Sequence, residues 1–186
     1  MNPTLREKRS LFINDFLEAE RARVLAQELR AYFAGIPLFT DGQCPNSPAV
    51  YNFLPLVELL LEKLPFVSER AGACLFPTFC YARSYTHGER LEPHRDRPAS
   101  EVSVTVNLDG DHAWPIFFGH PLTGIKTAVL EPGQAVIYLG CEITHWREPF
   151  PGQSYQQMFL HYVRSRGKYA TACFDNKTPE INGIRY

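Results

Sequence analysis

The sequence predicts a mainly β fold with some α-helix, in which N-terminal helices pack against one sheet of a double-stranded β-helix (jelly-roll) core. After Gly72 the apolar runs become short, rich in Val, Ile, Phe, Tyr and Thr, and separated by Gly, Pro and Asp. Helical patterns precede these runs without alternating with them, which argues against a parallel sheet. With 45% hydrophobic and 13% aromatic residues, the 186-residue chain can bury a sizeable core. We therefore expect a single domain over 1–186, with a helical part (about 1–71), a β core (about 72–164) and a C-terminal extension (165–186).

Two helical stretches are expected before the β core. The first runs from Asn14, with a capping Asn or Asp and early acidic residues, to Gly35. Its apolar positions are Leu17, Val24, Leu25 and Tyr32. Residues 36–50 contain several prolines and are predicted to form a loop, after which Pro55 opens a second helix that ends near Pro65. A short helix over 66–70 is expected to follow.

The β core is predicted from short apolar runs bounded by turn residues. The expected strands are 78–85, 101–108, 114–118, 127–130, 135–139 and 157–163. In the second of these the alternation is strict. Val102, Val104, Val106 and Leu108 share one face, and Ser103, Thr105 and Asn107 share the other. This pattern is typical of a half-buried strand.

The composition of the chain argues against two classes of partner, nucleic acids and membranes. The net charge is −1 and no Lys/Arg run is present, so we expect no nucleic-acid partner. The amino terminus has no apolar region, and no stretch approaches the roughly 20 apolar residues that cross a bilayer, so we expect a soluble cytoplasmic protein without membrane association. The five cysteines are scattered and odd in number, which favours free, mostly buried thiols.

One constellation of residues is suited to a metal ion. His94 and Asp96 are two positions apart, so on an extended strand both side chains leave the same face. His145, which follows the predicted strand 135–139, is the candidate for a third ligand. Two histidines and one carboxylate leave open positions and suit iron(II), whereas zinc prefers four-coordination. The alternative is that His94 and Asp96 form a surface pair without a metal.

The residues around this constellation resemble the prolyl 4-hydroxylase-like branch of the 2-oxoglutarate and iron(II) dependent dioxygenases. The resemblance is carried by Tyr85, Gly88, His94 and Asp96, by EPGQAVIY before the distal histidine and by HWREPFPG from that histidine onward, and it covers roughly residues 72–164. It implies that His94, Asp96 and His145 bind iron(II), and that 2-oxoglutarate and O2 are co-substrates. It also implies hydroxylation of an unactivated carbon, with succinate and carbon dioxide as by-products. Because Asp96 keeps the carboxylate ligand, hydroxylation is favoured over halogenation.

The resemblance also suggests residues for the co-substrate. Tyr85 matches the family tyrosine that contacts the far carboxylate of 2-oxoglutarate, although it could instead be an aromatic of the barrel core. The family usually places Arg or Lys about ten residues after the distal histidine, where this chain has Tyr155. Two arginines could replace that cation: Arg83, on the same strand face as Tyr85, and Arg147, two residues beyond His145. Either arginine could instead be structural and pair with a glutamate such as Glu148.

Further residues are expected near the pocket. Gln157, Phe159 and His161 alternate along the last predicted strand and should face the interior. We expect His161 to be a hydrogen-bonded part of the pocket wall rather than a metal ligand. Arg95 should point away from the two ligands, while Arg97 could orient Asp96 or reach the substrate.

Two other functions remain open. The first is a cupin-like metal enzyme that does not use 2-oxoglutarate, for which Tyr155 is the main argument. The second is a non-catalytic, anion-binding barrel. The expected substrate is a small molecule or a peptide side chain, and the sequence specifies neither its identity nor the oligomeric state.

Overall fold

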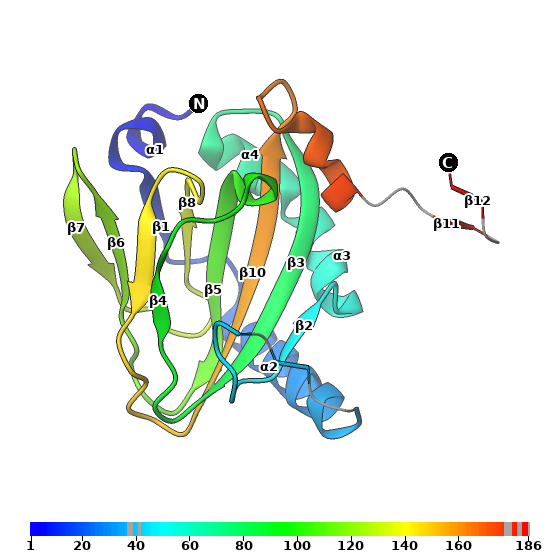
Figure 1. Cartoon of the computed structure of the whole chain (residues 1–186), viewed down its shortest axis with the longest axis vertical. Coiled ribbons are helices and arrows are strands. Elements are labelled where there is room, and N and C mark those ends of the chain that lie inside the picture. The colour runs from blue at the N-terminus through cyan, green and yellow to red at the C-terminus, as the bar shows by residue number, and fades with distance from the viewer. Residues whose placement is uncertain (37–38, 41, 177–179, 182–183, 186) are drawn as a thin grey trace.

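The computed structural model describes residues 1–36, 39–40, 42–176, 180–181 and 184–185, and it shows two antiparallel sheets with helices (Figure 1). The larger sheet contains, in spatial order, β1 (Ser10–Ile13), β8 (Ala135–Tyr138), β5 (Val102–Gly110), β10 (Ser154–Arg164), β3 (Leu75–Thr86) and β2 (Ala49–Tyr51). The smaller sheet contains β4 (Leu91–His94), β9 (Thr144–Arg147), β6 (Ile116–His120) and β7 (Gly124–Ala128). A separate pair, β11 (Glu180–Ile181) and β12 (Ile184–Arg185), lies near the C-terminus. The mainly β character predicted from the sequence is confirmed.

Each predicted strand has a counterpart. Besides the two-residue strands β11 and β12, the described part of the chain contains four short strands that were not predicted. These are β1, β2, β4 and β9, each of three or four residues. Strand β2 begins at Ala49, inside the range predicted as loop. Such short strands carry too few residues for a period of two to be recognised, and pairing with longer neighbours defines them.

Strand β5 corrects the expectation of a half-buried strand. Its valines do lie on one face, in the main hydrophobic core, and Ser103, Thr105 and Asn107 lie on the other. These three polar residues are 0–4% exposed, so both faces are buried. The reason is the position of β5 between β8 and β10, with the cavity side covered by the smaller sheet. Alternation of polar and apolar residues cannot distinguish solvent from buried polar partners such as Asp96 and Gln157.

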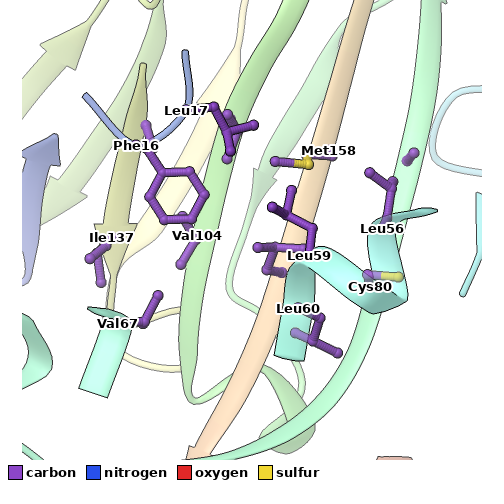
Figure 2. Packing of buried hydrophobic residues seen from close by; sticks show 14 of the residues in the cluster. Phe16, Leu17, Leu56, Leu59, Leu60, Val67, Cys80, Val104, Ile137 and Met158 are labelled. Carbon is purple, nitrogen blue, oxygen red and sulfur yellow. The ribbon is translucent and has the colours of Figure 1, made fainter. Parts of the chain in front are cut away.

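Helices cover the face of the larger sheet that points away from the smaller sheet (Figure 1). They are α2 (Ala19–Ala34), α3 (Leu54–Glu62) and α4 (Leu64–Ala71), while α1 (Pro3–Lys8), which was not predicted, precedes β1. Figure 2 shows Leu59 of α3 next to Met158 of β10, and Leu60 belongs to the same core cluster. The N-terminal helices therefore bury their apolar sides against one sheet, as predicted.

The first helix is shorter than predicted. It begins at Ala19, because the Leu17 N–H bonds the Gly133 carbonyl (3.0 Å) outside any helix. The buried side of α2 consists of Ala22, Leu25, Ala26, Leu29 and Phe33. Val24, assigned to the apolar side from the sequence, is 42% exposed.

All five cysteines are free, but the expectation that most are buried is wrong. Cys44 and Cys80 are buried, Cys74 is exposed, and the other two are intermediate. Among the described residues, no helix combines the length and apolar character needed to cross a membrane.

Candidate metal centre

The pairing of β4 with β9 brings the predicted metal ligands together. His94, at the end of β4, lies opposite His145 of β9 in the antiparallel register. Asp96 follows two residues later, and its N–H donates to the Gly140 carbonyl (2.9 Å). Its Oδ1 lies 3.7 Å from His94 Nε2 and 3.5 Å from His145 Nε2. One ligand atom from each residue falls within 4.8 Å of the other two, a spacing suited to a single metal ion.

A hydrogen bond at Nδ1 orients each of the two imidazoles toward the candidate metal position. Nδ1 of His94 lies 2.8 Å from the Glu92 carbonyl oxygen, and Nδ1 of His145 lies 3.3 Å from that of Ile143. A carbonyl only accepts, so each Nδ1 carries the proton and each Nε2 keeps its lone pair for a metal. Burial lowers the pKa of His145 to about 4, which favours the neutral form that a metal requires.

The three ligands open onto a cavity of about 250 Å³ between the sheets. Its walls include aromatic residues of the larger sheet, among them Phe79, Tyr81, Phe159 and His161. The sequence predicted that Phe159 and His161 would face this interior. The cavity thus combines a candidate metal centre with aromatic side chains and several charged or polar ones, as small-molecule sites commonly do.

Arg83 and Tyr85, two candidates for the co-substrate, both line this cavity. Each is 1% exposed. Arg83 donates from Nη2 to the Tyr81 hydroxyl (2.6 Å), and its guanidinium carbon lies 5.5 Å from the centre of the Tyr85 ring. Tyr85 in turn packs edge-on against Trp114, with ring centres 4.8 Å apart.

Arg147 and Gln157 lie outside the residues that line the cavity. The Arg147 guanidinium stacks over Trp114, 4.4 Å from the ring centre, and donates to the Trp114 carbonyl and to Gln157 Oε1 (2.9 Å). The Gln157 amide then donates to Thr105. Within the described chain, no carboxylate pairs with Arg147, so the alternative pairing with Glu148 does not form.

The three residues whose roles the sequence left open all line the cavity. Arg97 makes a two-point ion pair with Asp175 (2.5 and 3.0 Å), so it holds the C-terminal segment rather than orienting Asp96. Arg95 is exposed and approaches the Thr144 hydroxyl (3.4 Å). His161 hydrogen-bonds Ser103 (3.0 Å), which agrees with its expected place in the wall.

Sequence reasoning missed three residues that contact or approach Asp96. The Ser103 hydroxyl donates to Asp96 Oδ2 (2.8 Å). Gly140 passes so close that a Cβ there would lie 2.3 Å from the same oxygen. Burial and the Asp96 charge raise the pKa of Tyr138 well above its usual value. The alternation in β5 placed Ser103 on the polar face, but only the folded chain shows what it contacts.

Several solved structures share this fold. A Pseudomonas putida prolyl-4-hydroxylase is 18% identical, with a TM-score of 0.70 over 88% of this chain and 96% of that one. HygX from Streptomyces hygroscopicus, solved with nickel and 2-oxoglutarate, is 11% identical, with a TM-score of 0.70 over 87% of this chain and 85% of that one. The α-ketoglutarate-dependent epimerase SnoN of nogalamycin biosynthesis is 13% identical, with a TM-score of 0.71 over 87% of this chain and 80% of that one. At these identities the likeness establishes the shared fold.

Comparison with models of protein families gives no match, and comparison with curated protein sequences gives none either.

Proposed function

We propose that this chain is an iron(II) and 2-oxoglutarate dependent oxygenase, a single domain with a double-stranded β-helix core, that hydroxylates an unactivated carbon. The observation that carries the proposal is the convergence of His94, Asp96 and His145 on one point inside a cavity. Two imidazole nitrogens and one carboxylate oxygen fit iron(II) and leave coordination positions free. When bound, iron(II) and 2-oxoglutarate would supply oxygen activation coupled to decarboxylation of the keto acid.

The residues of the chain would hold and shield these groups. Glu92 and Ile143 fix the two imidazoles through their carbonyls, and Ser103 occupies the second oxygen of Asp96. The aromatic wall would shield the centre on one side, while 28% of the His94 side chain stays exposed. These contacts set the ligand geometry before any metal arrives, which lowers the cost of binding.

We assign the far carboxylate of 2-oxoglutarate to Arg83 and Tyr85 rather than to Arg147. Arg83 and Tyr85 both line the cavity that holds the three ligands, whereas Arg147 and Gln157 do not. A guanidinium that is 1% exposed at a cavity wall is suited to a charge-assisted contact with a carboxylate. Tyr155 stands where the family usually has a cation, so Arg83 would supply that charge from a neighbouring strand, since Tyr155 pairs with Tyr85 across β3 and β10.

Hydroxylation is favoured over the other outcomes that this fold supports. SnoN, which shares the fold, is named an epimerase, so the fold alone does not set the reaction. The shared fold with 2-oxoglutarate enzymes makes the cupin-like alternative less favoured. The substrate would be a small molecule or a peptide side chain, and the expected cytoplasmic location stays a prediction.

The proposal is tested by adding 2-oxoglutarate to the iron(II) protein without oxygen and following the weak visible charge-transfer band that chelation of a keto acid produces. We expect the band in the native protein and none in His94→Ala. Iron binding without a band would favour a metal enzyme with another co-substrate. Failure to bind iron(II) at micromolar concentrations would favour the anion-binding barrel.

The two arginines are separated by the same titration. Arg83→Gln should weaken 2-oxoglutarate binding by about 10- to 100-fold, the usual loss for a hydrogen bond to a charged group. Arg147→Gln should leave that affinity near the native value, provided that the variant is folded by circular dichroism. A larger loss of affinity in Arg147→Gln than in Arg83→Gln would reverse our assignment.

A further inference from the structure

A chain of hydrogen bonds connects His161 to the candidate metal ligand Asp96. Ser103 Oγ lies 2.8 Å from Asp96 Oδ2 and 3.0 Å from His161 Nδ1. Ser103 and His161 are paired across β5 and β10, the two central strands of the larger sheet. Both residues are buried, at 0% and 6% exposure, so their relative position is fixed by the sheet.

The hydrogens available in these two hydrogen bonds determine which nitrogen of the His161 imidazole is protonated. A serine hydroxyl has one hydrogen, and an ionised carboxylate can only accept. The hydroxyl also lies 3.2 Å from the Ser100 carbonyl oxygen, but its bond to Asp96 is the shortest of the three and is assisted by charge, so Ser103 donates its hydrogen to Asp96. The Ser103 oxygen then accepts, which requires a hydrogen on His161 Nδ1.

The other nitrogen of His161 is therefore an acceptor. Burial lowers the pKa of His161 to about 4, so near neutral pH the ring carries one hydrogen. With that hydrogen on Nδ1, Nε2 keeps a lone pair. No donor to Nε2 is found among the described residues, and His161 lines the cavity.

The surroundings of this acceptor are aromatic. The His161 ring stacks on Phe79 with centres 4.3 Å apart, and the Phe159 ring is nearly parallel to it, 6.4 Å away. Tyr81 extends the wall beyond Phe159, with centres 6.0 Å apart. Arg97 interrupts this aromatic surface, because its guanidinium carbon lies 4.3 Å from the centre of the Phe79 ring. An acceptor that no donor among the described residues reaches discriminates strongly, because a ligand without a donor leaves it unpaired.

We propose that His161 positions Asp96 through Ser103 and that its Nε2 accepts a hydrogen bond from the substrate. The substrate class that fits is an apolar ring or flat group bearing an N–H or O–H, lying against Tyr81 and Phe159. This inference rests on the proposed function, since it names the substrate class of the same cavity.

The first test measures the tautomer of His161 without iron or 2-oxoglutarate. Long-range proton–nitrogen spectra of the zinc-loaded protein with labelled histidine distinguish the two neutral forms, and His161→Phe or His161→Asn assigns the signal by its loss. We expect the hydrogen on Nδ1. A hydrogen on Nε2 in the native protein would overturn the proposal.

The positioning role is tested through metal affinity. Ser103→Ala should weaken iron(II) binding by about 10- to 100-fold, the usual effect of losing a partner of a metal ligand. It should also produce a mixture of the two His161 tautomers. Ser103→Thr, which keeps the hydroxyl, should restore both properties. The control is Ser84→Ala, which removes a hydroxyl that bonds Gln156 on the same sheet. Native iron affinity in a folded Ser103→Ala would contradict the positioning role.

The substrate class is tested with a matched pair of probes, indole and 1-methylindole. Indole can stack on the wall and donate its N–H to Nε2, whereas 1-methylindole can only stack. We expect indole to shift the His161 Nε2 resonance and 1-methylindole to leave it near its free position. Equal shifts from both probes, or none up to their solubility limits, would overturn the substrate class.

These measurements separate the inference from the proposed function. A missing keto-acid band with the expected tautomer and probe shifts would reject 2-oxoglutarate while keeping the His161 site. A normal keto-acid band together with a hydrogen on His161 Nε2 would keep 2-oxoglutarate and reject the His161 site.

Discussion

Gly140 shows how a residue without a side chain can determine a metal site. Its carbonyl accepts from the Asp96 N–H, and its Cα approaches the Asp96 carboxylate and the Ser103 hydroxyl. A Cβ at this position would lie 2.3 Å from Asp96 Oδ2 and 2.8 Å from Ser103 Oγ. The requirement here is space rather than an unusual backbone conformation.

Gly140→Ala should therefore displace Asp96 and weaken iron(II) binding by at least about 10-fold, as loss of support for a ligand does. Isothermal titration with iron(II) under nitrogen measures the effect. Gly35→Ala is the control, because a Cβ there meets only ordinary contacts at 3.7 Å. Native affinity in Gly140→Ala would mean that the backbone can move aside without cost.

Arg147 is a buried cation whose contacts explain it without a ligand. It is 1% exposed, stacks on Trp114 and bonds the Trp114 carbonyl and Gln157. Arg147→Ala should lower the free energy of unfolding by roughly 3 kcal/mol or more, because it leaves a cavity and unpaired polar groups. Urea unfolding of the metal-free protein measures this, with the exposed Arg166→Ala as control. Equal stability of the two variants would contradict a structural role for Arg147.

Helix α2 contributes to the stability of the fold through one side only. Leu29 is 0% exposed in the core, whereas Val24 is 42% exposed on the opposite side. Helix propensity does not predict which of the two positions is buried. The packing of α2 against β5 determines it.

Leu29→Ala should cost about 2–5 kcal/mol of the free energy of unfolding, the usual range for a leucine removed from a core. Val24→Ala should change it by less than about 0.5 kcal/mol, as surface substitutions do. Both are measured by urea unfolding followed by circular dichroism. Similar losses in the two variants would show that α2 packs differently from the structure.

At the scale of the whole molecule, stability should depend on pH through buried histidines. Burial lowers the pKa of His161 from 6.5 to about 4. Between these values the unfolded chain binds a proton that the folded chain does not, so acidification favours unfolding. The contribution of His161 is fully present above pH 6.5 and is lost as the pH falls toward 4.

The metal-free protein should therefore unfold at lower temperature as the pH falls from 6.5 to 4, and His161→Phe should reduce this dependence. Thermal unfolding across this range measures the slope. His112→Gln, which changes an exposed histidine, should keep the native slope. An unchanged slope in His161→Phe would show that folding does not lower the pKa of His161.

Elements with long, regular patterns and residues with distinctive chemistry could be predicted from the sequence. The helices over residues 54–71, the two faces of β5 and the pairing of His94 with Asp96 followed from periodicity and residue type, whereas His145 as the third ligand was implied by the family resemblance. These signals are local, because a helix or strand repeats within a few residues and two ligands on one strand share its face.

Features that depend on contacts between distant segments could not be predicted, and the folded structure was needed to find them. It paired β4 with β9, buried the polar face of β5, placed Arg83 in the cavity and Arg147 outside it, and brought Gly140 and Ser103 to Asp96. The sequence pattern around an inward-facing arginine is the same whether its side chain lines a cavity or stacks on a tryptophan. The physical reason is that burial and hydrogen bonding arise from the whole packed molecule, whereas propensity and periodicity belong to each segment alone.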